Sequence, residues 1–152
     1  MTEYALPEVD VEFYVDHIWA GRFVGPTIQL WYYYKIINKP PDLSLSLEEL
    51  VLNIDKLGIT LQIPRLSEVI TDEPDYIPIR GNPELVNRIS TYADKYVDEH
   101  GVWPEEVVTI KGKLRLKKLV PMGIFGIISE PRTVKEYDIT WSGPIKLETF
   151  VL

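Results

Sequence analysis

The sequence contains no cysteine, only two histidines and no long apolar run. Without cysteine, the chain can form neither disulfides nor thiolate-based zinc sites, and His17 and His100 alone are a poor basis for a metal site. No stretch approaches the roughly 18 apolar residues that cross a bilayer, and the first residues lack the basic and apolar regions of a secretory signal. We therefore expect a protein without cofactor, metal or membrane partner, located in the cytoplasm (host cytoplasm or virion if viral).

Thermolabile amides are also scarce. The chain holds two glutamines and four asparagines, against seventeen isoleucines and twelve prolines. Few amides combined with many charges and prolines is the bias of heat-adapted proteins. The composition predicts an origin in a thermophilic archaeon or in an archaeal virus.

Length and composition are those of one globular domain. The chain has 152 residues, 45% of them hydrophobic, and shows no repeat or composition break. We expect a single α+β domain over residues 1–152. The net charge of −7 disfavours general attraction to a phosphate backbone, although it permits a local basic patch.

Two strands are predicted near the N-terminus. Residues 9–19 alternate strictly, which places Val9, Val11, Phe13, Val15, His17 and Trp19 on one face and Asp10, Glu12, Tyr14 and Asp16 on the other. Residues 27–37 are apolar or aromatic on both faces, as is typical of a strand that is covered on both sides. The two strands predict an N-terminal hairpin.

The middle of the chain predicts two helices. Ser46-Leu-Glu-Glu49 has the form of a capping box, so a short helix is expected from there to Leu57, stopped by Gly58. A longer helix should start at Pro83 behind the cap Asn82 and end at Gly101. Between them, residues 59–63 look like a strand, and residues 66–80 are expected to form a long loop with one helical turn near 67–70.

The C-terminal third changes to a period of two. It predicts four strands near 105–119, 122–129, 133–141 and 145–151, separated by turn residues at 121, 130–131 and 142–144. The predicted fold class is therefore α+β, with an antiparallel sheet (N-terminal hairpin plus C-terminal meander) packed with one long and one short helix.

One predicted strand carries a stripe of cations. Residues 111–118 place four side chains on one face, namely Lys111, Lys113, Arg115 and Lys117. Such a stripe suits contact with an anion or a nucleic acid. The alternative is pairing with an acidic stripe, such as Asp10-Glu12-Asp16 or Glu136-Asp138, within the molecule or between subunits.

The second predicted strand presents a mixed aromatic face. Trp31, Tyr33 and Lys35 alternate along it, and Trp141 is a further candidate for the same binding surface. This mixture of aromatic and polar groups is found in interface cores and ligand-stacking surfaces. Packing of the face beneath the 83–100 helix would give the same pattern.

No catalytic signature stands out. The carboxylates of Asp10, Glu12 and Asp16 suggest a metal site or an acid–base pair, but a solvated strand face explains them as well. His17 is expected to be buried on the apolar face, and the glycines at 21–25 and 123–126 are expected in turns.

We therefore expect a non-enzymatic interaction or assembly protein, acting on a protein partner or on itself as a homo-oligomer, through an aromatic sheet face and paired charge stripes. A nucleic-acid-binding module using strand 111–118 is the first alternative. A small acid–base or metal-dependent enzyme is the second.

Overall fold

The computed structural model describes residues 2–5, 10–22, 25–38, 43–66, 75–80, 82–123, 126 and 128–151. These residues form eight strands, one α-helix and one short 3-10 helix. In chain order they are β1 (Thr2–Ala5), β2 (Asp10–Arg22), β3 (Pro26–Asn38), β4 (Leu43–Ile54), the 3-10 helix Asp55–Leu57, β5 (Ile59–Ile63), β6 (Asp75–Arg80), α1 (Pro83–His100), β7 (Glu105–Met122) and β8 (Ile128–Val151).

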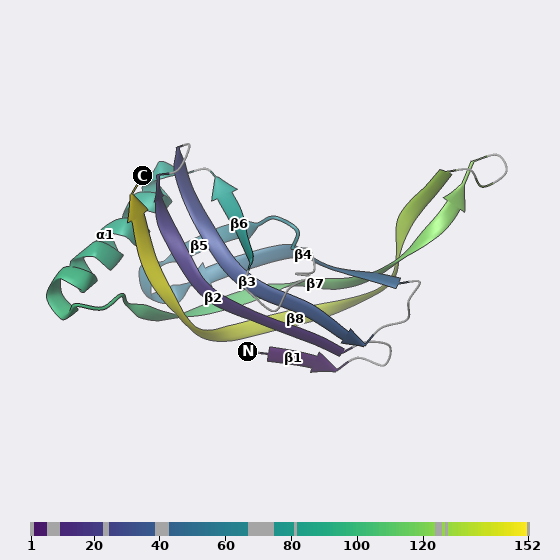
Figure 1. Cartoon of the computed structure of the whole chain (residues 1–152), viewed down its shortest axis with the longest axis horizontal. Coiled ribbons are helices and arrows are strands. Elements are labelled where there is room, and N and C mark those ends of the chain that lie inside the picture. Colours follow the sequence, from purple (N-terminus) through teal and green to yellow (C-terminus); the bar gives the residue numbers. More distant parts are fainter. Residues whose placement is uncertain are drawn as a thin grey trace.

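All the strands belong to one curled sheet (Figure 1). The order is β5-β4-β7-β8-β2-β3-β6, and β1 pairs with β2 outside this path. Every pair is antiparallel except β2 with β8, which run parallel, so the sheet is mixed. The apolar core lies on the inner side of the curl and draws on nearly every strand. The predicted fold class is thus wrong: the described chain is mostly β, with a mixed sheet and one α-helix instead of two.

The N-terminal hairpin forms as predicted, but the faces of β2 change along its length. Val11, Phe13 and Val15 are buried in the core, whereas the next buried residues are Ile18 and Ala20. A register shift in the pairing with β3 lies between Val15 and His17. Such a β-bulge inserts one residue and reverses the alternation after it. The prediction that His17 and Trp19 share the apolar face of Val11 is therefore wrong.

The short helix predicted from Ser46 is instead the strand β4. Its alternation of Leu43, Leu45 and Leu47 with polar residues fits a half-buried strand, and Leu45 and Leu47 are indeed buried. The Ser46 hydroxyl donates to Glu48 Oε1 at 3.1 Å rather than to a helix start. Tertiary pairing with β7 overrides the local capping pattern. Only the predicted end at Gly58 is correct: Gly58 takes the left-handed conformation, with φ of 62°, and ends the 3-10 helix.

The longer helix is confirmed as α1. The Asn82 side chain accepts a hydrogen bond from the Glu84 amide, Pro83 occupies the first turn, and Gly101 ends the helix with φ of 76°. Val86, Ile89 and Ala93 form its buried face. Figure 1 shows α1 at one end of the curled sheet, where it packs beside β8, β2 and β3.

Two further predictions about loops and turns are corrected. Residues 75–80, expected in a loop, form the edge strand β6, which pairs with β3. The helical turn predicted near 67–70 lies outside the described residues. The four-stranded meander is wrong as well, because residues 130–131 and 142–144 lie inside β8 and make no turns. β7 pairs along its whole length with residues 128–146 of β8, and residues 147–151 of β8 pair with β2 instead.

Candidate functional site

The ends of β7 and β8 extend beyond the rest of the sheet as a two-stranded arm (Figure 1). The last pairing of β7 with β4 joins Leu43 and Lys118. Past that point, residues 119–122 pair only with residues 128–131 within the described part of the chain. We call the described residues of this segment, 119–123, 126 and 128–131, the hairpin arm. It projects from the end of the molecule opposite α1.

The hairpin arm is open to solvent and mostly apolar: among its described side chains, Leu119 and Pro121 are exposed and apolar, and Glu130 is exposed and charged. The run 119–129 contains no charged residue, and Leu119 is 64% exposed. Val134, at the root of the arm, is 49% exposed. Gly123 and Gly126 have φ of 80° and 63°, a conformation that other L-residues rarely adopt. The arm is thus a turn-forming hairpin that offers apolar surface away from the core.

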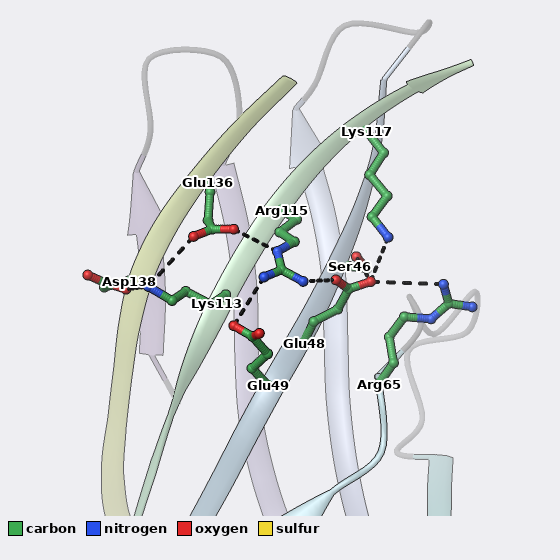
Figure 2. Close-up of polar contacts among 9 residues, drawn as sticks. All are labelled: Ser46, Glu48, Glu49, Arg65, Lys113, Arg115, Lys117, Glu136 and Asp138. Atoms are coloured by element: carbon green, nitrogen blue, oxygen red, sulfur yellow. Dashed lines mark hydrogen bonds and ion pairs between the residues drawn. The ribbon is translucent and has the colours of Figure 1, made fainter. Parts of the chain in front are cut away.

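A network of ion pairs lies on the outer face of β4, β7 and β8, next to the root of the arm (Figure 2). Arg115 is its centre, since its guanidinium contacts Glu48 at 2.5 Å, Glu49 at 3.0 Å and Glu136 at 2.7 Å. The other members are Ser46, Arg65, Lys113, Lys117 and Asp138. We call these nine residues the charge network. It ties three neighbouring strands together through their side chains.

Glu48 is the most tightly held carboxylate of the network. Its side chain is only 13% exposed, and Lys117 Nζ lies 2.6 Å from Oε1. Burial would raise the pKa of Glu48, but hydrogen bonds from Lys117, Arg115 and Ser46 outweigh burial and lower the pKa to about 2. Glu48 therefore remains ionised at all but very acidic pH.

The carboxylates reach Arg115 because β4 carries a bulge. The register with β7 shifts between Glu48 and Val51, and Glu49 has a positive φ of 53°. Two residues of β4 then oppose one residue of β7, as in other β-bulges. This kink brings both Glu48 and Glu49 within contact of the same guanidinium.

The cation stripe predicted for strand 111–118 is real, and most of it is compensated. The period-two arrangement is confirmed, since Leu114 and Leu116 are buried while the cations lie on the outer face. Lys113 contacts Asp138, which raises the pKa of Lys113, and Arg115 holds the pKa of Glu136 below its usual range. The predicted pairing with Glu136-Asp138 is thus confirmed. Lys111 is exposed on β7 opposite Thr140.

Pairing weakens the case for nucleic-acid contact through this strand. Each of Lys113, Arg115 and Lys117 already has a carboxylate partner at close range. A phosphate would have to compete with these partners, and the chain as a whole is acidic. Contact of this stripe with an anion or a nucleic acid stays a prediction without support from the geometry.

Aromatic rings gather on the outer face of β2, β3 and β6. Trp31 lies at the centre, with ring centroids 5.2 Å from His17, 5.6 Å from Trp19 and 4.9 Å from Tyr76. We call these four residues the aromatic patch. Tyr76, on the edge strand β6, is 44% exposed. The bulge in β2 creates the patch, because it turns His17 and Trp19 to the outer face.

Carboxylates border the aromatic patch. Asp16 Oδ2 lies 2.6 Å from His17 Nδ1, and Glu148 Oε2 lies 4.0 Å from His17 Nε2. Glu148 also accepts a hydrogen bond from the Trp19 indole. His17 Nε2 is buried and has no hydrogen-bond partner in the described part of the chain, so it is closed to a substrate in this arrangement. The patch suits binding better than acid–base chemistry.

The other predicted binding residues are not members of the aromatic patch. Trp141 is 3% exposed and faces the core, where it packs edge-on against Phe13 at 6.2 Å. Tyr33 is buried and packs against Tyr14 at 5.1 Å on the outer face. Lys35 lies in β3 opposite Glu12, and its side chain is outside the described part.

The acidic stripe of β2 is only partly described. Asp16 partners His17, whereas the side chains of Asp10 and Glu12 lie outside the described residues. Among the described residues, no group of three or more His, Asp or Glu side chains could hold a metal ion. Nor does any described helix have the length and apolarity that crossing a membrane requires.

Comparison of the chain with protein-family models, curated proteins and solved structures finds no match. The site must therefore be interpreted from its own geometry.

Sequence reasoning missed the hairpin arm and the grouping of His17, Trp19 and Tyr76 around Trp31. The arm has a signal in the uncharged run 119–129, which is preceded by Lys117 and Lys118 and followed by Glu130 and Arg132. The pattern indicates a hairpin that leaves the core. It was interpreted as two ordinary strands because the turn residues at 130–131 suggested a second break.

Proposed function

We propose that this chain is a non-enzymatic assembly protein in which the hairpin arm makes the contact between copies. The observation that supports this proposal is the arm itself. It continues two long strands past their last neighbour and presents apolar surface, including Leu119, to solvent.

A two-stranded hairpin that projects alone is unstable in water. Isolated hairpins are marginally stable at best, because they bury too little apolar surface to offset the loss of chain entropy. Exposed contiguous apolar surface on a folded protein usually marks an interaction site. A partner that covers the arm satisfies both requirements.

The charge network supports the same function because it stiffens the root of the arm. Lys117, two residues before the arm begins, is bound to Glu48 of β4, and Arg115 links β4, β7 and β8. An arm that is held in one direction loses less conformational entropy on binding than a flexible arm does. The network thus preorganises the arm for a fixed contact.

The test compares the full chain with a variant whose arm is trimmed. Residues 119–131 are replaced by Asn-Gly, which favours a tight two-residue turn and keeps the pairing of β7 with β4. Size-exclusion chromatography with light scattering should give the full chain a mass above that of the 17.6 kDa monomer, and the trimmed variant the monomer mass.

The matched control is Val107→Asp, at a β7 residue that is 61% exposed and lies far along the strand from the arm. This variant should assemble like the parent. A monomeric full chain at high protein concentration would contradict the proposal, as would a trimmed variant of unchanged mass.

A further part of the proposal is that the protein comes from a heat-adapted source, a thermophilic archaeon or an archaeal virus. Beside the composition, it is supported by the linked arrangement of the charge network, since such networks contribute most at high temperature.

A further inference from the structure

We infer that a hollow beside α1 binds a small carboxylate that carries an apolar body, such as a fatty acid or an aryl acid. The hollow lies between α1 and the 3-10 helix and has a volume of about 640 Å³. It is lined by Leu57 and by one side of α1 from Glu84 to Lys95, and we call it the α1 hollow. Its volume falls in the range of about 300–1,000 Å³ that is usual for small-molecule sites. Figure 1 shows α1 at the end of the molecule opposite the arm, so the inference does not depend on the assembly function.

The floor of the α1 hollow is apolar and held in place. Leu57 and Tyr92 are half-buried and pack against the core, and both also line the hollow. The Tyr92 hydroxyl donates a hydrogen bond to Glu106, and Lys56 Nζ lies 5.6 Å from the centre of the Tyr92 ring. These contacts fix the ring on the side away from the hollow. An apolar body that covers Leu57 and Tyr92 removes their surface and its own from water, which favours binding.

Arg88 is a fixed cation at the rim of the α1 hollow. Its guanidinium donates a hydrogen bond to the Leu57 carbonyl and lies against the turn at Gly58, where an added Cβ would be 3.8 Å from Nη2. Arg88 has no carboxylate partner in the part of the chain that the structure describes. A guanidinium has five N–H donors, and two of them match the two oxygens of a carboxylate. The backbone therefore orients Arg88 and leaves it donors for a ligand.

The charges around the α1 hollow favour a ligand with a single negative charge. Lys95, two turns after Arg88 on the same side of the helix, also lacks a carboxylate partner among the described residues. Glu84 lines the hollow one turn before Arg88 but forms no ion pair with it in the described chain. Lys56 and Glu106, next to the hollow, pair with each other at 3.1 Å and cancel.

Two cations and one carboxylate give the lining of the α1 hollow a net charge of +1. This surplus contrasts with the whole chain, whose net charge is −7, and with the charge network, whose cations are paired with carboxylates. A local charge of +1 suits a monocarboxylate better than a doubly charged phosphate. The hollow thus combines an apolar floor with an oriented cation, which are the two features that an apolar carboxylate requires.

Titration with octanoate tests the inference, with acetate and octylamine as matched probes. Acetate keeps the carboxylate but lacks the apolar body, whereas octylamine keeps the apolar body and carries a cation instead. Isothermal titration calorimetry of the full chain should show octanoate binding one to one at millimolar concentration or below. Acetate and octylamine should not bind in the same range. In amide NMR spectra, the signals that octanoate shifts should be those of α1 and of residues 55–58.

Two variants test the charge and the shape of the α1 hollow separately. Arg88→Gln removes the guanidinium and should weaken octanoate binding at least about tenfold. Thr91→Trp places a large ring in the hollow from an exposed helix position, and should abolish octanoate binding although every charge is kept. The control is Lys111→Gln, which removes an exposed cation of β7 and should bind octanoate like the parent. Circular dichroism spectra that match the parent's would show that the three variants are folded.

The opposite results are equally specific. If either Arg88→Gln or Thr91→Trp binds octanoate like the parent, the ligand lies elsewhere and the inference is overturned. Absence of octanoate binding, or equal binding of octylamine, would overturn it as well. Octyl phosphate that binds about tenfold more tightly than octanoate would overturn the choice of a carboxylate. The mass of the full chain in solution tests the assembly function independently of all these titrations.

Discussion

Gly112 of β7 lies directly against Leu50 of the β4 bulge. A Cβ atom on Gly112 would come within 2.5 Å of Leu50 Cδ2 and 2.9 Å of the Glu48 carbonyl oxygen. The bulge that turns Glu48 and Glu49 toward Arg115 is therefore possible only because its neighbour in β7 has no side chain. The glycine between Lys111 and Lys113 thereby helps to build the charge network.

We expect Gly112→Ala to lower the free energy of unfolding by about 1–3 kcal/mol, the usual cost of forcing an extra methyl group into a packed site. Part of the contact is with backbone, which cannot move aside as a flexible side chain can. Guanidinium titration followed by circular dichroism measures the change. Lys111→Ala, next in the strand and exposed, should stay within about 0.5 kcal/mol of the parent.

Glu48 should make stability depend on pH in the acid range. Its pKa is about 2 in the folded chain against 4.5 for the unperturbed group, so folding favours the ionised form. The stabilisation is complete above about pH 5 and is lost as the pH falls toward 2. After allowance for solvent screening, ionised Glu48 stabilises the folded chain by about 2 kcal/mol.

The variant Glu48→Gln isolates this contribution. It should be less stable than the parent at pH 7, and the difference should shrink between pH 5 and pH 2 because the parent loses the same charge there. Guanidinium midpoints at several pH values give the comparison. The control is Lys111→Ala, at an exposed position outside the network, which removes no carboxylate and should keep the parent's pH dependence between pH 5 and pH 2. A constant difference for Glu48→Gln across this range would contradict the assignment.

Local patterns in the sequence predicted those elements whose signals lie within a few residues. The helix from Pro83 to His100 is fixed by its own cap, proline and glycine, and strand 59–63 by its own alternation. Both were predicted with the bounds that the structure shows. The cation stripe is correct for the same reason, because a period of two depends only on neighbouring residues.

The features that were predicted wrongly depend on pairing between strands that lie far apart in the sequence. The capping pattern at Ser46 was outweighed by the pairing of β4 with β7, whose residues lie some seventy positions later. The bulge at Asp16 depends on how β2 meets β3, and a single extra residue reversed the expected faces of His17 and Trp19. Trp141 was grouped with Trp31 by composition alone, and the sheet places it on the opposite, inner face.

Trp141 and Tyr76 should therefore respond differently to replacement. Trp141→Ala empties a core position beside Phe13 and should cost about 3–5 kcal/mol of stability. Tyr76→Ala removes a half-exposed ring at a sheet edge and should cost less than about 1 kcal/mol. Guanidinium titration of both variants at low protein concentration checks this, since dilution removes any contribution from assembly. Equal losses would contradict the inner placement of Trp141.

Arg115 gives the test of heat adaptation. Its planar guanidinium contacts Glu48, Glu49 and Glu136 at once, which the single ammonium of a lysine cannot do. Ion pairs contribute more to stability as temperature rises, because the free-energy cost of removing charged groups from water falls. We expect the parent to melt above about 80 °C, well outside the range of about 45–65 °C that is usual for mesophilic domains.

Arg115→Lys keeps the charge but loses the linked geometry, so it should lower the melting temperature by several degrees, at roughly 2–4 °C per kcal/mol for a chain of this size. Lys111→Arg, a matched exchange on the same face of β7, should leave the melting temperature unchanged. Differential scanning calorimetry at pH 7 measures all three proteins. A parent protein that melts within the mesophilic range would remove the argument for a thermophilic source. An Arg115→Lys variant with the same melting temperature as the parent would show that the network contributes little to stability at high temperature.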